Sequence, residues 1–381
     1  MTTNNTPRLP RSCDVGSART GHETGGRGTT RRGVLHLGVA AAAGALGGLS
    51  WPAHAAQKPF RIALSNAYNG NEWRRQHAEA FERACKDLQA AGIISTYSAV
   101  HGSDNSVPAQ LAAIGDMILK GNNGILINCS SGSQVGGVIE QAADAGIKVV
   151  SYDAYASSDR SWNIGFDFAS WGRNNAEFIE KHLGGPGKAA GNILIVRLSL
   201  GATAGKLIYN EYQAMLARNP GLKVVGEVEG QATRSVAQRN VAQIVPSLPK
   251  IDGVLGAGGN DSFGIVEGML ASGYTMETMP PICTGADGDY VQWWREARDK
   301  YGYTATGLNA DPEIGAWAAY YLARILLDDD NEPKDWFAPS VPTNDENIDS
   351  YAHVTGERIP VQVFTFEQIP EVFTRTDKLP A

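Results

Sequence analysis

The stretch Gly124–Asp153 reads GILINCSSGSQVGGVIEQAADAGIKVVSYD and decides the predicted fold. It begins with a short apolar run, passes through a small polar turn into a segment with apolar side chains on one helical face, and ends in a second apolar run. This change from a continuous run to a 3.6-residue period and back predicts a strand, a helix and a strand. Two such consecutive parallel strands form a right-handed βαβ unit.

Short polar side chains follow both of these strands. Ser130 and Ser131 come after the first strand, and Asp153 ends the second. Parallel α/β sheets bind ligands beyond the carboxyl ends of their strands. We therefore expect a hydroxyl-rich small molecule at this edge of the sheet.

The same alternation of strands and helices continues along the chain. Gly, Asn and Asp clusters separate the periodic segments, as is typical of tight strand-to-helix turns. We interpret the polar, Pro-containing stretch Asp328–Tyr351 as a loop excursion. Strands are predicted over Pro59–Leu64, Ile93–Val100, Trp162–Gly165, Asn192–Arg197, Leu222–Glu229, Gly253–Ala257, Pro281–Gly285, Thr304–Asn309 and Val361–Phe366, and helices over Glu72–Ala91, Pro108–Lys120, Ala169–His182, Ala204–Arg218, Ser235–Val245, Tyr290–Lys300 and Pro312–Leu327.

A weak internal repeat indicates two similar lobes. Asn123–Leu126 (NGIL) leads into polar residues and then GVIE, and Asp252–Leu255 (DGVL) leads into polar residues and then GIVE. A chain of 381 residues also suits two lobes, at roughly 100–200 residues per domain. Two copies of one α/β lobe would place a binding cleft between them.

The first 55 residues differ from the rest. Thr30–Leu35 contains a twin-arginine pair, an Ala- and Gly-rich apolar stretch follows over Val34–Leu49, and Ala53–Ala55 has the small-x-small pattern of a cleavage site. We predict a Tat export signal that is removed after Ala55. The alternative, a membrane anchor, is disfavoured because a span needs roughly 18–20 strongly apolar residues.

Charge and cysteine usage restrict the partners. Removal of residues 1–55 takes away six Arg and two acids, which changes the net charge from -7 to -11 and does not indicate a nucleic-acid partner. No Cys follows the apolar stretch, so we expect a protein without a lipid anchor that is periplasmic, or secreted if the cell has no outer membrane. The remaining Cys85, Cys129 and Cys283 lack metal-ligand spacing and are interpreted as buried small hydrophobes. No metal or cofactor is predicted.

These segments resemble the type I periplasmic sugar-binding proteins, the solute receptors of ABC importers of the ribose and galactose group. The resemblance rests on Gly124–Asp153, Gly253–Asp261, Gly285–Gly288 and Thr304–Gly315, in that order and spacing. It implies an α/β fold with two similar doubly wound parallel-sheet lobes joined by a three-strand hinge. The implied amino-terminal lobe comprises residues 56–165 and 310–357, and the implied carboxyl-terminal lobe comprises residues 166–309 and 358–381.

The resemblance also implies a set of ligand-binding residues at strand ends. In ribose receptors an Arg follows the residue that matches Asp153. Ala154 follows it here, so this contact is either missing or replaced by Tyr155. Lys206 matches a position that usually holds Arg, and an aromatic residue expected near Gln231 is missing. The ligand-binding residues that the resemblance implies are Asn66, Tyr68, Asp153, Tyr155, Lys206, Asn260, Asp287 and Asn309. Two further candidates come from the residues themselves: Trp73, whose ring suits either a sugar face or the core, and Ser130, which follows a strand end.

The chemistry of these residues suits a sugar independently of the family. Aspartate accepts hydrogen bonds from hydroxyls, asparagine both donates and accepts, and aromatic rings pack against the apolar faces of a sugar. Each Asn or Asp alone is more often a helix cap or turn residue. Four of them at strand ends, Asn66, Asp153, Asn260 and Asp287, favour ligand contact.

The sequence bears on four candidate functions. The first is capture of a monosaccharide or related polyol by a monomeric, non-enzymatic protein and its delivery to an ABC permease in the inner membrane. A secreted oxidoreductase is disfavoured because Ser65–Asn71 lacks the G-x-G-x-x-G pattern. A sugar-responsive repressor would need a helix-turn-helix where the export signal stands. A receptor that only presents the ligand to a chemoreceptor or kinase stays open.

Overall fold

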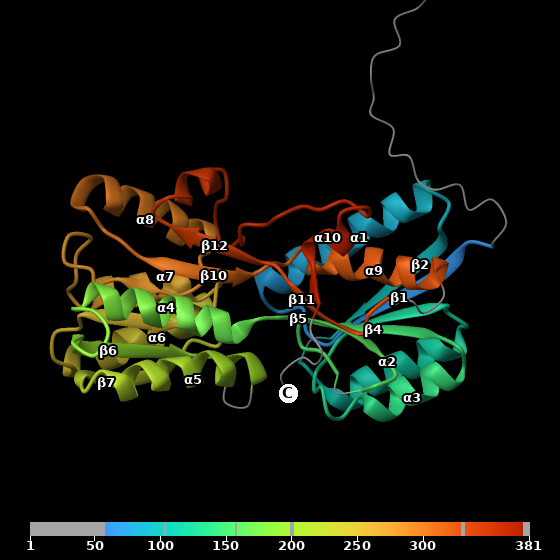
Figure 1. Cartoon of the computed structure of the whole chain (residues 1–381), viewed down its shortest axis with the longest axis horizontal. Helices are drawn as coiled ribbons and strands as arrows, with labels where there is room; N and C mark the ends of the chain where they lie inside the picture. Colours follow the sequence, from blue (N-terminus) through green and yellow to red (C-terminus); the bar gives the residue numbers. More distant parts are fainter. Residues whose placement is uncertain (1–57, 103, 157, 199–201, 329–331, 376–381) are drawn as a thin grey trace, which may run out of the picture. The chain divides into compact units, whose positions relative to one another are not determined.

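The structure is a computed structural model that describes residues 58–102, 104–156, 158–198, 202–328 and 332–375. The predicted export signal lies outside these ranges. The described strands form one seven-stranded, one four-stranded and one two-stranded sheet (Figure 1). Within the same ranges, no helix has the length and apolarity needed to cross a membrane.

The seven-stranded sheet contains the two strands of the stretch Gly124–Asp153. Its order is β13-β11-β5-β4-β3-β1-β2, and every pair is parallel except β11 with β13. β3 (Gly124–Asn128), α3 (Gly136–Asp144) and β4 (Lys148–Tyr152) confirm the predicted βαβ unit. The other strands are β1 (Phe60–Asn66), β2 (Ile94–His101), β5 (Trp162–Phe166), β11 (Asp335–Ala338) and β13 (Thr374–Arg375).

Helix α1 (Glu72–Ala90) follows β1 after a short loop. Asn71 begins it, because the Asn71 side chain accepts a hydrogen bond from the backbone N–H of Arg74 at 3.0 Å. Its buried face includes His77, Phe81 and Leu88 and packs against α9 (Ile314–Leu327). The remaining helices of this region are α2 (Val107–Leu119), α3 and the short α10 (Ile369–Val372).

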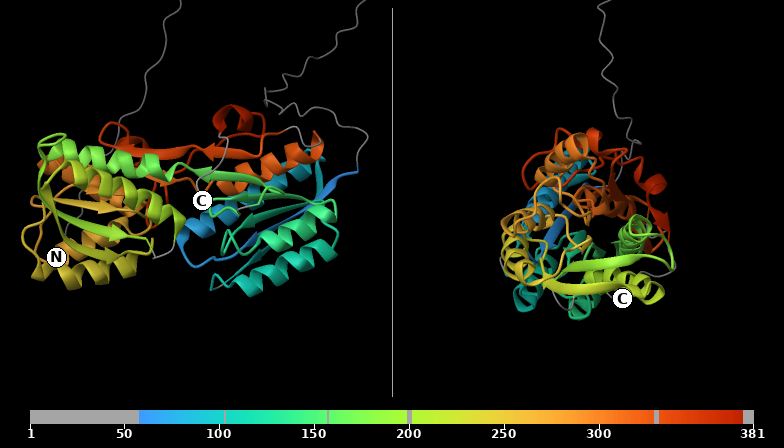
Figure 2. Two further views of the ribbon diagram at one scale, coloured as in Figure 1. Left: turned by 60° about the horizontal axis from the view of Figure 1, so that its bottom comes forward. Right: turned by 90° about the vertical axis from the view of Figure 1, so that its left-hand side faces the viewer.

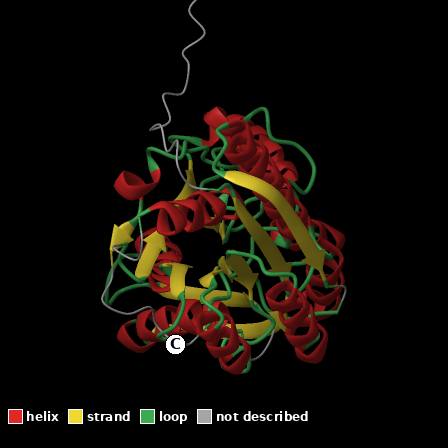
Figure 3. Cartoon of the chain, turned by 90° about the vertical axis from the view of Figure 1, so that its right-hand side faces the viewer, coloured by secondary structure: helices red, strands yellow, loops and turns green. Residues whose placement is uncertain are grey.

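The four-stranded parallel sheet has the order β7-β6-β8-β9. α4 packs against α5 and α6 packs against α7, and Figures 2 and 3 show helices beside the strands. Its core includes Leu194, Met269 and Trp294. The elements are β6 (Ala190–Arg197), β7 (Gly221–Glu229), β8 (Gly253–Gly256), β9 (Ile282–Cys283), α4 (Phe168–His182), α5 (Thr203–Arg218), α6 (Arg234–Ile244), the 3-10 turn η1 (Val245–Ser247), α7 (Ser262–Ala271) and α8 (Gly288–Tyr301).

The carboxyl-terminal part differs from the prediction in its elements. The stretch interpreted as a loop contains β11, β12 (Ser340–Asn344) and the 3-10 turn η2 (Ile348–Tyr351). Val361–Phe366 was predicted as a strand, but the structure assigns none to it. Phe364 and Phe366 pack instead against Trp317 and Tyr320 of α9, so side-chain packing rather than strand pairing orders this segment.

Strand pairing also differs from the predicted division of the chain. β12 pairs antiparallel with β10 (Thr306–Ala310), although residues 310–357 were predicted to accompany the first lobe. β13 pairs with β11 in the seven-stranded sheet, although residues 358–381 were predicted to accompany the second lobe. The single residue Pro339 separates β11 from β12, so the chain passes from the seven-stranded to the two-stranded sheet at this point.

Candidate functional site

The carboxyl ends of β1, β3 and β4 bring polar side chains together. Asn66 and Asn128 end β1 and β3 and are paired in register, and Asp153 follows β4. Both asparagines are buried, and the Asn128 Nδ2 donates to Asp153 Oδ2 at 3.3 Å. The predicted residues Asn66 and Asp153 therefore lie at one edge, together with Asn128, which the sequence analysis missed.

Asp153 has an uncommon backbone conformation. Its φ is 57°, in the left-handed region that non-glycine residues seldom adopt. Strain of this kind persists where the surrounding structure holds a residue in place, and it is concentrated at binding and active sites. The observation supports a functional role for Asp153.

Arg74 is the second residue that the sequence analysis missed. It lies in the first turn of α1, and its Nη2 is 3.4 Å from Asp153 Oδ2. Its guanidinium lies 5.2 Å from the ring centroid of Trp73, and its Nη1 is buried with no hydrogen-bond partner among the described residues. An arginine was expected directly after Asp153, where Ala154 stands. Arg74 places a cation beside Asp153 instead. The sequence signal is its place in the first turn after a strand end.

His77 contacts both Trp73, the neighbour of Arg74, and Tyr152, the neighbour of Asp153. It stacks on Trp73 with ring centroids 5.5 Å apart, and its Nε2 and the Tyr152 hydroxyl are hydrogen-bonded. Burial lowers the pKa of His77 to about 3, with Arg74 as the second cause. His77 is therefore neutral at physiological pH and fixes the Trp73 ring.

Asp287 lies at the other sheet, after β9. It caps α8, because its Oδ1 accepts from the backbone N–H of Tyr290 at 2.8 Å. Its Oδ2 is buried and has no hydrogen-bond partner among the described residues. Burial raises the pKa of Asp287 to about 8. The carboxyl therefore presents one free oxygen and holds a proton near neutral pH.

Two predicted residues near Asp287 bond to protein groups. Asn309 accepts from the backbone N–H of Ala286 at 3.0 Å and donates to the Ala286 carbonyl at 3.1 Å. Asn260 accepts from the backbone N–H of Trp73 at 3.1 Å and donates to the Glu357 carbonyl at 2.6 Å. Both side chains are buried and hold backbone segments together.

Asp261 is a further buried carboxyl that the prediction did not include. Burial raises its pKa to about 7, and the backbone amides of Asp261 itself and of Ala232 partly offset this effect. A Cβ at Gly230 or Gly258 would lie 2.4 Å from its oxygens. A side chain at either position would displace the Asp261 carboxyl, so the loops there enclose Asp261 closely.

The other predicted residues lie in varied surroundings. Ser130 donates from its backbone N–H and its hydroxyl to Gln110 Oε1, at 2.7 and 2.8 Å. Lys206 is exposed in the first turn of α5. Tyr68 is half-buried and covers Gly70, and burial raises the pKa of the half-buried Tyr155 to about 12.

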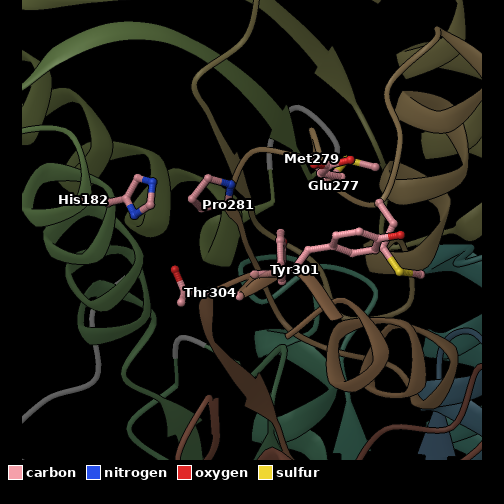
Figure 4. Close-up of a pocket in the computed structure, with 9 residues that line it drawn as sticks. His182, Glu277, Met279, Pro281, Tyr301 and Thr304 are labelled. Carbon is pink, nitrogen blue, oxygen red and sulfur yellow. The ribbon is translucent and has the colours of Figure 1, made fainter. Parts of the chain in front are cut away.

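A pocket of about 140 Å³ lies away from all these residues. It is at the opposite end of β9 from Asp287, since Pro281 precedes that strand. Figure 4 shows the side chains around it. Because it is remote from the carboxyl strand ends, we do not assign the ligand to it. It is lined by His182, Met276, Glu277, Met279, Pro281, Tyr301, Gly302, Tyr303 and Thr304.

Comparison with known proteins adds to the geometry. Residues 62–330 match the family model described as a periplasmic binding protein domain. The multiple sugar-binding periplasmic receptor ChvE of Rhizobium radiobacter is 27% identical over 221 residues, 54% of this chain and 62% of the relative. The multiple sugar-binding periplasmic protein SbpA of Azospirillum brasilense is 26% identical over 54% of this chain and 61% of the relative. The matched part thus spans about three fifths of each relative.

Solved structures cover more of the chain. An ABC transporter solute binding protein from Thermobispora bispora is 28% identical, with a TM-score of 0.73, and covers 82% of this chain and 94% of that one. One from Bacillus halodurans with bound myo-inositol is 17% identical, with a TM-score of 0.65, over 78% of this chain and 99% of that one. Such a distant likeness shows the shared fold.

The raised pKa of Asp287 predicts a pH dependence of stability. Between about pH 4 and pH 8 the folded state retains a proton on Asp287 that the unfolded state has lost. The free energy of unfolding of the wild type should therefore fall as the pH rises through this window. The free energy of unfolding of the Asp287→Asn variant should fall less over the same window. Urea unfolding of both proteins at several pH values measures this difference.

Asp261 also lowers the free energy of unfolding as the pH rises to about 7, but it does so in both the wild type and Asp287→Asn. The difference between these two proteins therefore reports on Asp287. Asp116→Asn, which changes an exposed carboxyl on α2, is the control and should behave as the wild type does. Identical pH profiles for Asp287→Asn and wild type would show that Asp287 is ionised in the folded protein.

Proposed function

This chain belongs to the periplasmic binding protein domain family, and from that premise we propose that it is the sugar-binding receptor of an ABC importer. It captures a monosaccharide or related polyol and delivers it to a permease in the inner membrane. The binding step makes and breaks no covalent bond. The names of the two curated relatives, both multiple sugar-binding periplasmic proteins, support this proposal.

Buried polar atoms without partners are the observation that carries the proposal. Among the described residues these include Oδ1 of Asn66, Asn69 and Asn128, Nη1 of Arg74 and Oδ2 of Asp287. A buried polar atom left unpaired costs about 1–3 kcal/mol. The three asparagine oxygens are acceptors, Nη1 of Arg74 is a donor, and the protonated Asp287 can donate from Oδ2. Hydroxyl groups can satisfy both kinds.

The charges favour a neutral ligand. The Arg74 guanidinium and the Asp153 carboxylate pair with each other, so their net charge is zero. Asp287 is held largely protonated near neutral pH by burial. A sugar acid would add an unpaired negative charge to this surrounding, and an amino sugar would add a positive one. We therefore propose a neutral sugar or polyol.

The two larger sheets are the proposed centres of two lobes. The chain runs from one sheet region to the other between β5 and α4, between β10 and α9 and between β11 and β12, and it returns between η2 and α10. A ligand that contacts strand ends of both sheets binds the closed arrangement more tightly than the open one, and it therefore shifts the population toward closure.

Binding of neutral sugars is the primary test. Calorimetry and thermal-shift measurements on pentoses, hexoses and cyclic polyols, with uronates and amino sugars alongside, should show binding of at least one neutral compound. Uronates and amino sugars should bind more weakly than the matching neutral sugar. Absence of binding by all neutral compounds would reject the proposed function, and preference for a uronate would reject the charge argument.

Arg74 should be a main contributor to affinity. Arg74→Met removes a donor to the ligand and leaves Asp153 without its cation, so we expect a loss of about 2 kcal/mol, roughly 30-fold in Kd. The matched control is Arg75→Met, because Arg75 is the exposed neighbour that pairs with Glu72 at 2.9 Å. It should change Kd by less than about twofold. Equal effects of the two substitutions would remove Arg74 from the site.

Export through the Tat route is proposed for residues 1–55, with cleavage near Ala55 and release of a monomeric protein into the periplasm. The twin pair Arg31-Arg32 supports it. Replacement of both by Lys should leave the full-length protein in the cytoplasm, as measured by fractionation and immunoblotting. Mature protein in the periplasm of this variant would contradict the proposed route.

A further inference from the structure

The imidazole of His101 meets one of the asparagines at the carboxyl strand ends. His101 ends β2 and is paired in register with Asn66, the last residue of β1. The backbone N–H of Gly102 donates to the Asn66 carbonyl at 2.8 Å and keeps the two strand ends together. His101 Nδ1 lies 3.1 Å from Asn66 Nδ2, within hydrogen-bond distance. Both residues belong to the seven-stranded sheet, so their contact does not depend on the arrangement of the two proposed lobes.

This bond determines which end of the Asn66 amide is left for a ligand. The amide nitrogen only donates, so His101 Nδ1 accepts here and the imidazole is neutral. Asn66 is 1% exposed, and its Oδ1 is buried with no hydrogen-bond partner among the described residues. Asn66 therefore offers an acceptor to a ligand hydroxyl.

The neighbouring Asn128 divides its amide in the same way, but its partner can act in only one way. Asn128 Nδ2 donates to Asp153 Oδ2 at 3.3 Å, and Asn128 Oδ1 is buried and unpaired in the described part of the chain. A carboxylate only accepts, so the Asn128 amide has a single orientation. An imidazole accepts when it is neutral, but both of its nitrogens donate when it is protonated. The orientation of Asn66 therefore depends on the charge of His101.

The surroundings of His101 keep the ring neutral at physiological pH and leave it able to titrate. Partial burial lowers the pKa of His101 below its ordinary value of 6.5, and the Glu82 carboxylate on α1 opposes this effect. β1 and α1 are the main elements that pack against β2. The other titratable groups that they contribute are His77 of α1, which is neutral, and Arg61 at the opposite end of β1. His101 stays exposed on one side, so its ring exchanges protons with water.

We propose that His101 is a positioning residue for sugar binding: as a neutral imidazole it turns Asn66 Oδ1 toward a ligand hydroxyl, and as an imidazolium it reverses the amide. Of the Asn66 and Arg74 side chains, the neutral state leaves an acceptor (Oδ1) and a donor (Nη1) without protein partners. The protonated state leaves two donors, which do not suit the same hydroxyls. The effect on affinity rests on the proposed function, but the pairing of His101 with Asn66 is independent of any ligand.

The pH dependence of sugar affinity tests the proposal. The probe is the neutral sugar that binds the wild type most tightly, with myo-inositol, D-allose and D-arabinose tried first. In His101→Asn an amide oxygen can stand where Nδ1 was, and it does not titrate, so Kd at neutral pH should stay within about twofold of the wild type. From about pH 7.5 to about pH 5, Kd of the wild type should rise at least about threefold more than Kd of His101→Asn. Other titratable groups of the site, such as Asp287, are present in both proteins.

The control is His182→Asn, which changes an exposed histidine at the end of α4 and should keep the wild-type pH profile. Equal pH profiles for the wild type and His101→Asn would overturn the proposal. A loss of more than about tenfold at neutral pH in a folded His101→Asn protein would show that the imidazole itself contacts the sugar, and it would overturn the proposal as well.

NMR of the histidine rings gives a readout that a merely structural role would not change. At neutral pH the nitrogen shifts of the unliganded protein should show a proton on His101 Nε2 and none on Nδ1. Sugar binding selects the state in which Nδ1 accepts, so it should lower the pKa of His101 by about one pH unit. An unchanged or raised pKa would contradict the proposal. If no neutral sugar binds, the proposed function fails, whereas a proton on Nδ1 of the neutral ring would refute the pairing with Asn66 by itself.

Discussion

The backbone amides that begin α1 are the constraint on which the candidate site depends. They need acceptors from outside the helix, and Asn71 directly before them provides one for the N–H of Arg74. Because α1 follows β1 after a short loop, the same bond places the helix relative to the ends of β1, β3 and β4. The meeting of Arg74 with Asp153 therefore follows from a backbone requirement as well as from charge.

Most of the strands and helices can be predicted from the sequence because their burial pattern is local. β3, α3 and β4 coincide with the apolar runs and the helical face of Gly124–Asp153. β11 and β12 could not be found this way, because they are four and five residues long and Pro342 interrupts the pattern. Their partners lie far away in sequence, so tertiary contacts decide which sheet each joins.

The candidate site was predictable only in part. Asn66, Asp153 and Asp287 could be found because polar residues that follow apolar runs mark the ends of strands. Arg74 was missed, since an arginine on a charged helix surface is usually solvated and its place in the first turn after a strand end is a weak signal. Asn128 was hidden as the last residue of an apolar run. Asn260 and Asn309 match ligand positions in sequence, but their bonds to backbone groups appear only in three dimensions.

Trp73 gives the molecule an optical property. Its indole stacks on His77, lies beside the Arg74 guanidinium and is partly exposed, whereas the other tryptophans in the described ranges are buried. Indole emission depends on the polarity and charge around the ring. A change at the strand ends therefore alters the fluorescence of Trp73, while the emission of the buried tryptophans stays constant. The chain carries an intrinsic, label-free reporter at the place where its ligand is proposed to bind.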